Sequence, residues 1–205
     1  MDAVTVFQAA ALTVAAFFIG GIPWGVIVAR LSGGPDPRTI GSGRTGGANV
    51  MRAVGPRLAL LSGLLDMLKG TAAVLLARWV GAGIEVEVLC GIAAIIGHSR
   101  SPFLGFSGGR GVSAAFGAAL VLAPFAAAIL FVAFLVVLAI TRYTSLASLV
   151  SAVVGGVVLA IQVIVTGQPP ALLVFAIVGP TLIWLFHLDN IGRLLRGEER
   201  KFGAK

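Results

Sequence analysis

Charged side chains are scarce in this sequence: 11% of its 205 residues are charged, while 58% are hydrophobic. Ordinary soluble domains carry roughly 25% charged residues. So little charge excludes a soluble globular domain, because most of the surface must face lipid. We therefore expect one polytopic membrane domain that comprises residues 1–205.

Cysteine and histidine are also rare, with one cysteine and two histidines in the chain. Cys90 alone cannot form an internal disulfide, and so few ligands exclude the usual zinc patterns. We expect no metal and no cofactor. A net charge of +7 is also typical of proteins that bind nucleic acid. Because the basic residues lie in short segments between apolar runs, they indicate membrane orientation instead, and we expect no nucleic-acid partner.

Long apolar runs divide the chain into expected transmembrane segments. They cover residues 3–29, 58–79, 86–97, 111–140, 143–166 and 171–186. The first run is too long for the core of a signal peptide, so we expect a retained helix. The basic segment 31–57 that follows belongs in the cytoplasm, which places the N-terminus outside.

The run 111–140 decides the topology. As one helix it would be roughly 45 Å long, against a hydrocarbon core of about 30 Å. A single crossing would also place Arg142 and the basic C-terminus outside. A hairpin of two short helices that turns near Pro124 keeps all basic residues except Arg78 and Lys69 at the cytoplasmic face. We therefore predict an all-α membrane protein with seven helical segments, an external N-terminus and a cytoplasmic C-terminus.

Three polar segments share the predicted cytoplasmic face, and the first covers residues 41–52. It combines closely approachable glycine backbone with Ser42, Asn49, Arg44 and Arg52, all of which bind anions. It is not a Walker A loop, because no Gly-Lys-Ser/Thr follows at the required spacing. No base accompanies Ser42, so we expect it to donate hydrogen bonds and not to act as a nucleophile. The alternative is a turn-rich interfacial loop.

The second polar segment covers residues 97–112 and contains His98 and Arg110. Arg110 stands at the start of an expected helix, where a phosphate would meet both free N–H groups and a planar guanidinium. The alternative is a flexible loop in which His98 has a structural, interfacial role.

The third polar segment covers residues 187–201. His187 and Asn190 are spaced i,i+3, so on a helix they point the same way. A histidine beside an amide can shuttle a proton and hold a carbonyl oxygen. The alternative is a basic tail that binds anionic lipid head groups, a role that suits Arg196, Arg200 and Lys205.

Two ionisable residues, Asp66 and Lys69, lie inside the second span at i,i+3 spacing. Such groups are costly in a bilayer unless they are paired or line a polar cavity. The spacing predicts either a structural ion pair or a contribution to the site.

Together the three segments resemble the PlsY family of acyl-phosphate:glycerol-3-phosphate acyltransferases, membrane enzymes with seven helices and three cytoplasmic motifs. The chain retains Gly41, Ser42, Gly43, Gly46, Asn49 and Arg52 of the first motif, and Gly97, His98, Phe103, Phe106, Gly108, Gly109, Gly111 and Val112 of the second. It also retains His187, Asn190, Ile191, Arg193, Leu194, Gly197, Glu199 and Lys201 of the third. It departs from the pattern at Arg44, Thr45, Gly47 and Ala48, and at Ser107 and Arg110, which replace the two lysines of the second motif.

The resemblance implies transfer of a fatty acyl group from acyl-phosphate to the 1-hydroxyl of sn-glycerol 3-phosphate, which yields lysophosphatidic acid and phosphate in phospholipid biosynthesis. It implies binding of glycerol 3-phosphate by Ser42, Arg52 and Arg110, and a cradle for acyl-phosphate at Gly108, Gly109 and Gly111. His187 and Asn190 would be catalytic, with either His187 or the substrate phosphate as the base. Gly43, Asn49, His98, Arg193 and Glu199 are further expected binding residues, and Arg44, Asp66 and Lys69 are additional candidates.

The expected partners are the two phosphorylated substrates and membrane lipids, in a bacterial-type inner membrane with the active site at the cytoplasmic face. Two alternatives remain at this point: a transporter of a small phosphorylated solute, and a catalytically lapsed paralogue that binds lipid phosphate. The sequence does not specify an oligomeric state.

Overall fold

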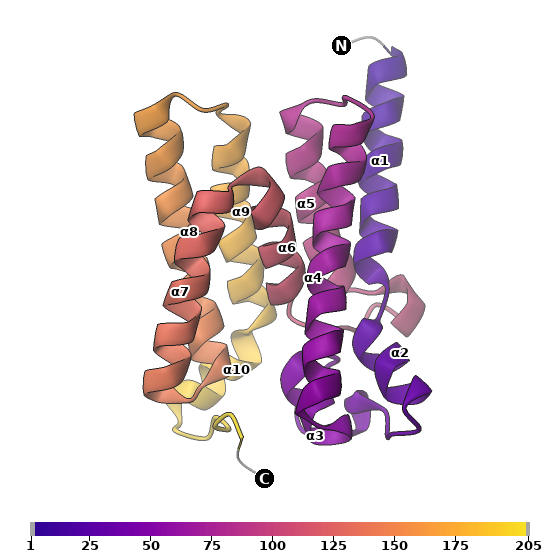
Figure 1. The fold of residues 1–205 in the computed structure, drawn as a ribbon, viewed down its shortest axis with the longest axis vertical. Coiled ribbons are helices and arrows are strands. Elements are labelled where there is room, and N and C mark those ends of the chain that lie inside the picture. The colour runs from indigo at the N-terminus through magenta and orange to yellow at the C-terminus, as the bar shows by residue number, and fades with distance from the viewer. Residues whose placement is uncertain (1–2, 204–205) are drawn as a thin grey trace.

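The computed structural model describes residues 3–203, which form helices joined by mostly short connections (Figure 1). The α-helices are α1 (Ala3–Gly21), α2 (Trp24–Leu31), α3 (Gly47–Val54), α4 (Pro56–Trp79), α5 (Ile84–Ser99), α6 (Val112–Leu122), α7 (Pro124–Thr141), α8 (Thr144–Thr166), α9 (Ala171–Phe186) and α10 (Leu188–Leu195). Short 3-10 helices cover Pro37–Thr39 and Pro102–Leu104. The all-helical prediction is confirmed.

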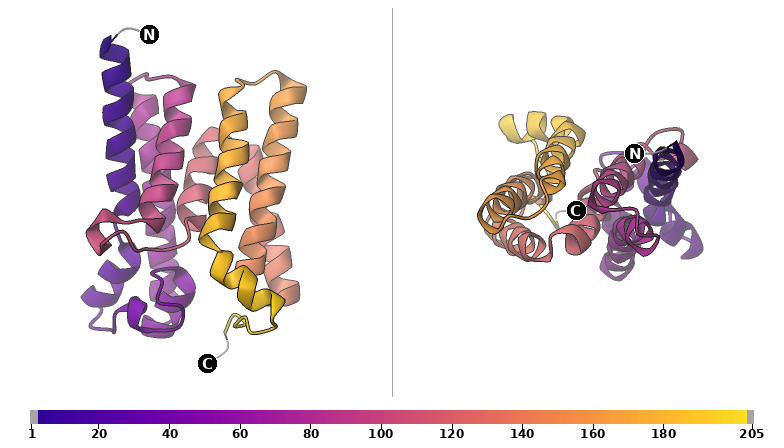
Figure 2. Two further views of the ribbon diagram at one scale, coloured as in Figure 1. Left: turned by 180° about the vertical axis from the view of Figure 1, so that it is seen from behind. Right: turned by 90° about the horizontal axis from the view of Figure 1, so that it is seen from above.

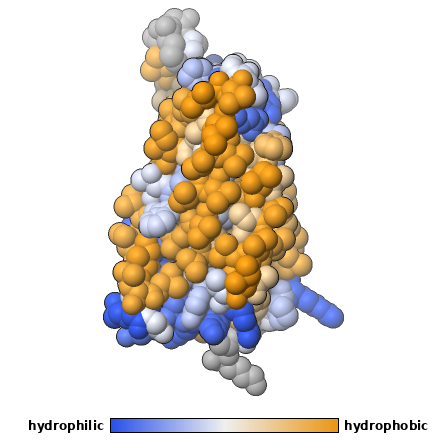
Figure 3. Space-filling model, turned by 90° about the vertical axis from the view of Figure 1, so that its left-hand side faces the viewer, coloured by the Kyte–Doolittle hydropathy of each residue, from blue (hydrophilic) through white to orange (hydrophobic). Residues whose placement is uncertain are grey.

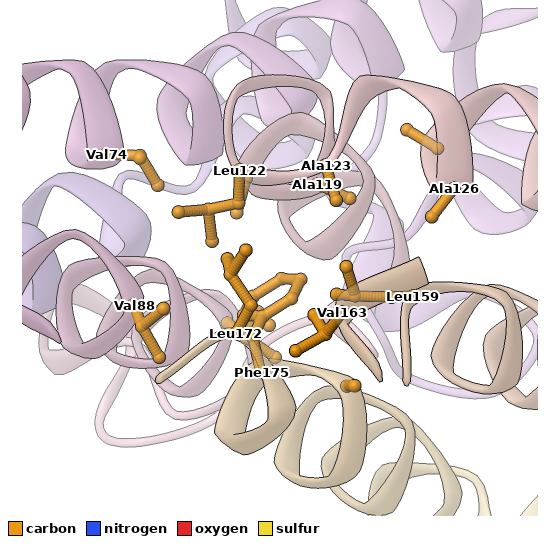
Figure 4. Packing of buried hydrophobic residues seen from close by; sticks show 14 of the residues in the cluster. Val74, Val88, Ala119, Leu122, Ala123, Ala126, Leu159, Val163, Leu172 and Phe175 are labelled. Atoms are coloured by element: carbon orange, nitrogen blue, oxygen red, sulfur yellow. The ribbon is translucent and has the colours of Figure 1, made fainter. Parts of the chain in front are cut away.

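The long helices form two groups with α6 between them. Helices α1, α4 and α5 lie on one side and α7, α8 and α9 on the other (Figures 1 and 2). Helix α6 contacts α4, α5, α7 and α9. Figure 4 shows how buried side chains from both groups, among them Val88, Leu122, Leu159 and Phe175, pack around this junction. The short helix α6, together with direct contact between α5 and α9, therefore joins the two groups into one bundle.

The predicted hairpin within residues 111–140 is confirmed. Helix α6 ends at Leu122 and α7 begins at Pro124, whose missing N–H is tolerated in a first helical turn. Helix α6 stops short of the far end of the bundle, and α7 returns to the end that holds α10 (Figure 1). There the Phe202 N–H donates to the Arg142 carbonyl over 2.6 Å, so Arg142 and the C-terminal segment share one end.

Because α6 is short, its last carbonyl groups lie within the bundle and require donors. Arg78 supplies one: its Nη2 donates to the Val121 carbonyl over 3.1 Å and to the Glu87 carboxylate over 2.6 Å. Glu87 is nearly buried, so the pair ties α4 and α5 to the end of α6. This contact explains why Arg78 is basic although it lies at the end of the bundle opposite the other basic groups.

The first predicted span, residues 3–29, is interrupted in the structure. The helix breaks at Ile22 and Pro23, because proline has no N–H to continue the ladder. The Gly21 carbonyl accepts from Ser101 Oγ over 2.6 Å, and the Ile22 carbonyl accepts from Lys69 Nζ over 2.8 Å. Segment 31–57, predicted as a loop, also contains α3, which its high glycine content obscured.

Within residues 3–203, four helical segments are long and apolar enough to cross a membrane: Thr5–Leu31, which runs through α1 and α2, Pro56–Trp79, Pro124–Thr141 and Thr144–Thr166. The number is five if the bent pair α9–α10 counts as one span. Helix α6 is shorter, as expected for one arm of a hairpin. Figure 3 shows a face on which hydrophobic side chains form a broad band between hydrophilic ends. The predictions for the N-terminus itself and for Lys205 lie outside the described residues.

Candidate functional site

A cavity of about 590 Å³ lies where the three polar segments meet, at the end of the bundle formed by α3 and α10. Eleven of the sequence-predicted site residues line it: Ser42, Arg44, Asn49, Arg52, Asp66, His98, Arg110, His187, Asn190, Arg193 and Glu199. These residues come from segments far apart in the sequence. The fold therefore brings the three polar segments together around one space.

Five predicted residues do not line the cavity: Gly43, Lys69, Gly108, Gly109 and Gly111. The three glycines of the second segment pack instead against α5. A Cβ on Gly109 would overlap Nε2 of His98, and one on Gly108 would overlap the His98 carbonyl oxygen. Their lack of side chains lets residues 108–111 lie directly on α5. Direct contact between these glycines and a substrate remains a prediction.

The first segment is organised by Asn49, which is buried in the first turn of α3. Its Nδ2 donates to Ser42 Oγ over 3.1 Å and to the Arg44 carbonyl over 2.9 Å. Its Oδ1 accepts from Arg52 Nη1 over 2.9 Å. Asn49 uses both ends of its amide, so it orients a hydroxyl and a guanidinium that face the cavity.

Arg110 forms a bidentate ion pair with Asp189, with nitrogen–oxygen distances of 2.7 and 2.9 Å. A third bond runs from Arg110 Nη1 to the Phe186 carbonyl over 3.2 Å. Asp189 also accepts from Arg193 over 3.3 Å. Sequence analysis did not identify Asp189 as a site residue, although an acid in the first turn of a basic helix signals such a partner.

Glu199 connects α10 to the start of α8. Its carboxylate accepts from Ser145 Oγ over 2.8 Å, from Asn190 Nδ2 over 2.6 Å and from Arg193 Nε over 2.7 Å. Burial disfavours the charged form, but these hydrogen bonds hold the pKa of Glu199 below its usual range. The ionised Glu199 carboxylate thus holds the Asn190 side chain in place. Sequence analysis did not identify its partner Ser145 as a site residue.

His187 is 2% exposed and lies between α9 and α10. Its Nδ1 is 2.7 Å from the Ile183 carbonyl oxygen. A carbonyl only accepts, so Nδ1 carries the proton and Nε2 is left as an acceptor. Burial lowers the pKa of His187 to about 4, and the nearby Arg110 charge acts in the same direction. The imidazole is therefore neutral at neutral pH.

The polar groups inside the second span form an ion pair, one of the two alternatives that the sequence left open. Lys69 Nζ lies 2.8 Å from Asp66 Oδ1, and both side chains are at least 95% buried. His98 Nδ1 is 3.6 Å from the same oxygen. Asp66 and His98 reach the cavity, whereas Lys69 points to the break between α1 and α2. The pair therefore supports both the helix break and one wall of the site.

The remaining wall of the cavity is apolar. It is made by Leu60, Leu64 and Met67 of α4, Phe116 of α6, and Phe131, Phe134 and Leu138 of α7. The rings of Phe116 and Phe131 stack with centroids 5.4 Å apart. The cavity thus has a cationic, hydrogen-bonding end and an apolar side, which suits an amphiphilic ligand with an anionic head. No cluster of three metal-ligating side chains occurs within residues 3–203.

Comparisons with known proteins agree with this geometry. A family model for glycerol-3-phosphate acyltransferases matches residues 10–197. A glycerol-3-phosphate acyltransferase from Rubrobacter xylanophilus is 42% identical over 194 residues, which cover 95% of each chain. Glycerol-3-phosphate acyltransferase 1 of Deinococcus radiodurans is 40% identical over 189 residues, which cover 92% of this chain and 93% of the relative.

Two solved structures have the same fold. The crystal structure of PlsY (YgiH), an integral membrane glycerol 3-phosphate acyltransferase, in its glycerol 3-phosphate form superposes with a TM-score of 0.87 at 36% identity. Its lysophosphatidic acid form superposes with a TM-score of 0.85 at 35% identity, and both matches cover 96% of each chain. This chain therefore belongs to the glycerol-3-phosphate acyltransferase family.

Proposed function

We propose that this protein transfers a fatty acyl group from acyl-phosphate to the 1-hydroxyl of sn-glycerol 3-phosphate. The products are lysophosphatidic acid (1-acylglycerol 3-phosphate) and inorganic phosphate, as in phospholipid biosynthesis. The observation that carries the proposal is the single cavity that joins all three polar segments to an apolar wall. Family membership and the glycerol 3-phosphate and lysophosphatidic acid forms of PlsY support it.

The two sides of the cavity match the two parts of the product. Phosphate groups suit the end that holds Ser42, Arg52 and Arg110, because guanidinium groups bind phosphate oxygens with charge-assisted hydrogen bonds. The first turn of α6 adds backbone N–H groups, since Val112 and Ser113 also line the cavity. An acyl chain suits the wall formed by α4, α6 and α7. Arg44 lines the cavity and Ser107 does not, so the positive charge lost at Ser107 is replaced elsewhere in the site.

His187 is best suited to orient the hydroxyl of the acceptor. Its neutral Nε2 accepts a hydrogen bond, but a pKa of about 4 makes it a weak base near neutral pH. Asn190 is held by Glu199 through Nδ2, and its buried Oδ1 has no hydrogen-bond partner. This leaves an unused acceptor beside His187. Both residues therefore favour recognition of a hydroxyl group over polarisation of a carbonyl.

The chemistry needs no acyl-enzyme, because acyl-phosphate is already activated. The acceptor oxygen forms a bond to the acyl carbon, and the bond from that carbon to the phosphate oxygen breaks. The departing phosphate takes the hydroxyl proton, which balances the reaction. The protein's contribution is to hold the hydroxyl oxygen close to the face of the acyl carbonyl carbon and to neutralise the charge on both phosphates.

An acyltransfer assay tests this function. Purified protein given acyl-phosphate and labelled glycerol 3-phosphate should form labelled lysophosphatidic acid, and free fatty acid in place of acyl-phosphate should give none. Absence of product from a folded, monodisperse preparation would contradict the proposal. Counterflow of labelled glycerol 3-phosphate in vesicles would then identify a transporter, and binding without either reaction would identify a lapsed paralogue.

We further infer one domain with seven membrane segments in a bacterial-type inner membrane, with the site at the cytoplasmic face. The hairpin α6–α7 and the contact between Arg142 and the C-terminal segment support this topology. In intact cells, a membrane-impermeant maleimide should label Glu85→Cys, at the start of α5, but not Gly47→Cys or Leu195→Cys. All three positions are exposed, and the native Cys90 is buried. Labelling at only one of positions 47 and 195 would overturn the topology and the shared site together.

A further inference from the structure

Two arginines from distant parts of the chain converge at the polar end of the cavity. A Cβ placed on Gly41 would lie 3.2 Å from Nη1 of Arg52 and 3.2 Å from Nη1 of Arg200. It would also lie 2.5 Å from Oδ1 of Asn49, which accepts from Arg52. Arg52 belongs to α3, and Arg200 belongs to the C-terminal segment that follows α10. Both side chains line the cavity. The two guanidinium groups therefore approach the same small space.

These two charges lack a carboxylate partner. Among the ion pairs of residues 3–203, none includes Arg44, Arg52 or Arg200. The other two cavity arginines, Arg110 and Arg193, are both neutralised by acids. Like charges at short range repel, so an arrangement that directs two unpaired guanidinium groups at one point favours an anion there.

The backbone on both sides of Arg200 is anchored. Its neighbour Glu199 accepts three hydrogen bonds from Ser145, Asn190 and Arg193. Two residues further on, Phe202 exchanges hydrogen bonds with Arg142: its N–H donates over 2.6 Å and its carbonyl accepts over 3.2 Å. Arg200 is exposed, but these contacts fix the segment that carries it against α7 and α8. Its position beside Gly41 is thus imposed by the fold.

We propose that Arg200 is a substrate-binding residue that, with Arg52, clamps the phosphate of glycerol 3-phosphate beside Gly41 and Ser42. This inference rests on the proposed function. Gly41 has φ +60°, a backbone conformation that favours glycine, and a Cβ there would lie 2.5 Å from Asn49 Oδ1, the acceptor that holds Arg52 in place. Ser42 lines the same cavity, and its Oγ accepts from Asn49 Nδ2. Arg200 is not among the residues through which the third segment resembles the family.

The acceptor phosphate fits this position better than the donor phosphate does. In acyl-phosphate the phosphate is bonded directly to the reacting carbonyl, so it must lie beside the acceptor hydroxyl and His187. Arg110 is the cation close enough to His187 to affect its titration. In glycerol 3-phosphate the phosphate is separated from the reacting 1-hydroxyl by the glycerol backbone, so it requires a second cationic group at a distance from the reacting atoms.

The test is the variant Arg200→Gln, compared with Arg196→Gln on the same segment. Arg196 is exposed and pairs only with the exposed Glu198, which makes it a matched loss of charge outside the cavity. We expect Arg200→Gln to raise the KM for glycerol 3-phosphate about 10- to 100-fold, the loss typical of a charge-assisted contact. The kcat and the KM for acyl-phosphate should stay within about threefold. Arg196→Gln should leave all three constants near wild type, and Arg200→Lys should restore part of the affinity.

Each other outcome has a defined meaning. An unchanged KM for glycerol 3-phosphate in Arg200→Gln overturns the clamp. A rise confined to the KM for acyl-phosphate overturns it too and assigns Arg200 to the donor. If the wild-type protein has no acyltransferase activity, the proposed function fails, and calorimetric titration of glycerol 3-phosphate into wild type and both glutamine variants still decides the clamp. Thermal unfolding of each variant excludes a folding defect as the cause.

Discussion

The variant His187→Ala should lower kcat by about 100-fold or more, the cost of losing the correct position of a reacting group. The KM for glycerol 3-phosphate should change much less, because the cationic groups at the other end of the cavity remain. The physical reason is the geometry of the imidazole. The Ile183 carbonyl fixes the proton on Nδ1, and burial keeps the ring neutral, so Nε2 is held ready to accept a hydrogen bond.

The pH dependence of kcat distinguishes two roles for His187: orienting the hydroxyl as a neutral ring, or acting as a base with an ordinary histidine pKa. The active form of His187 is neutral, so kcat at saturating substrates should fall as the pH drops through about 4 and the ring gains a proton. Between pH 5.5 and 8 His187 should contribute no change. An acid limb near pH 6.5 that disappears in a His187 variant would contradict the assignment.

Leu188→Ala is the matched control for the histidine variant. Leu188 is the neighbouring residue, begins α10 and is 63% exposed. Truncation there should leave kcat within about twofold of wild type. A large loss in both variants would mean that the junction of α9 and α10 is simply sensitive to change, and it would remove the evidence for a specific role of His187. A loss in His187→Ala that appears only in KM would argue against a role in turnover.

The variant Gly109→Ala should lower kcat/KM by about 100-fold or more although it introduces only one methyl group. That methyl group would overlap Nε2 of His98, which is buried and cannot move away freely. The segment 108–111 must then shift away from α5. It carries Arg110 and leads into the first turn of α6, and displacements of about 1 Å at a reacting site cost about 100-fold in rate.

Gly63→Ala is the control for this steric argument. Gly63 lies in α4 and also lines the cavity, but a Cβ there meets no atom within 4 Å. Its activity should stay within about threefold of wild type, and the helix should gain slightly in stability because alanine is the better helix former. Full activity of Gly109→Ala, measured in the same assay, would show that the close packing of the loop on α5 is unimportant.

Several features were predictable because they depend on composition and on the order of residues. The scarcity of charge and the long apolar runs predicted a lipid-embedded helical chain. Pro124, together with the bias of basic residues, predicted the α6–α7 hairpin that the structure contains. The i,i+3 spacings of Asp66 with Lys69 and of His187 with Asn190 predicted one ion pair and one pair of cavity residues. These are local or statistical properties, so sequence alone carries them.

Other features of the site could not be predicted from composition or residue order. The close packing of Gly108 and Gly109 on His98 was not apparent from the sequence, and contact of these glycines with a ligand stays a prediction. Substrate binding by Asn49 stays a prediction, and the structure adds that both ends of its amide bond to Ser42, Arg44 and Arg52. Whether a polar group is free for a ligand depends on its neighbours in space, and those neighbours are supplied by other parts of the chain.

The sequence by itself determined that this protein is a bundle of apolar helices with three polar, basic segments, because hydrophobicity and charge order are enough to place a chain in a bilayer. Only the tertiary structure decided which of the arginines remain available. Asp189 and Glu199 neutralise Arg110 and Arg193, while Arg52 and Arg200 meet at Gly41 without an acid. Electrostatic pairing acts over a few ångströms in space, so its outcome is set when α3, α10 and the C-terminal segment come together.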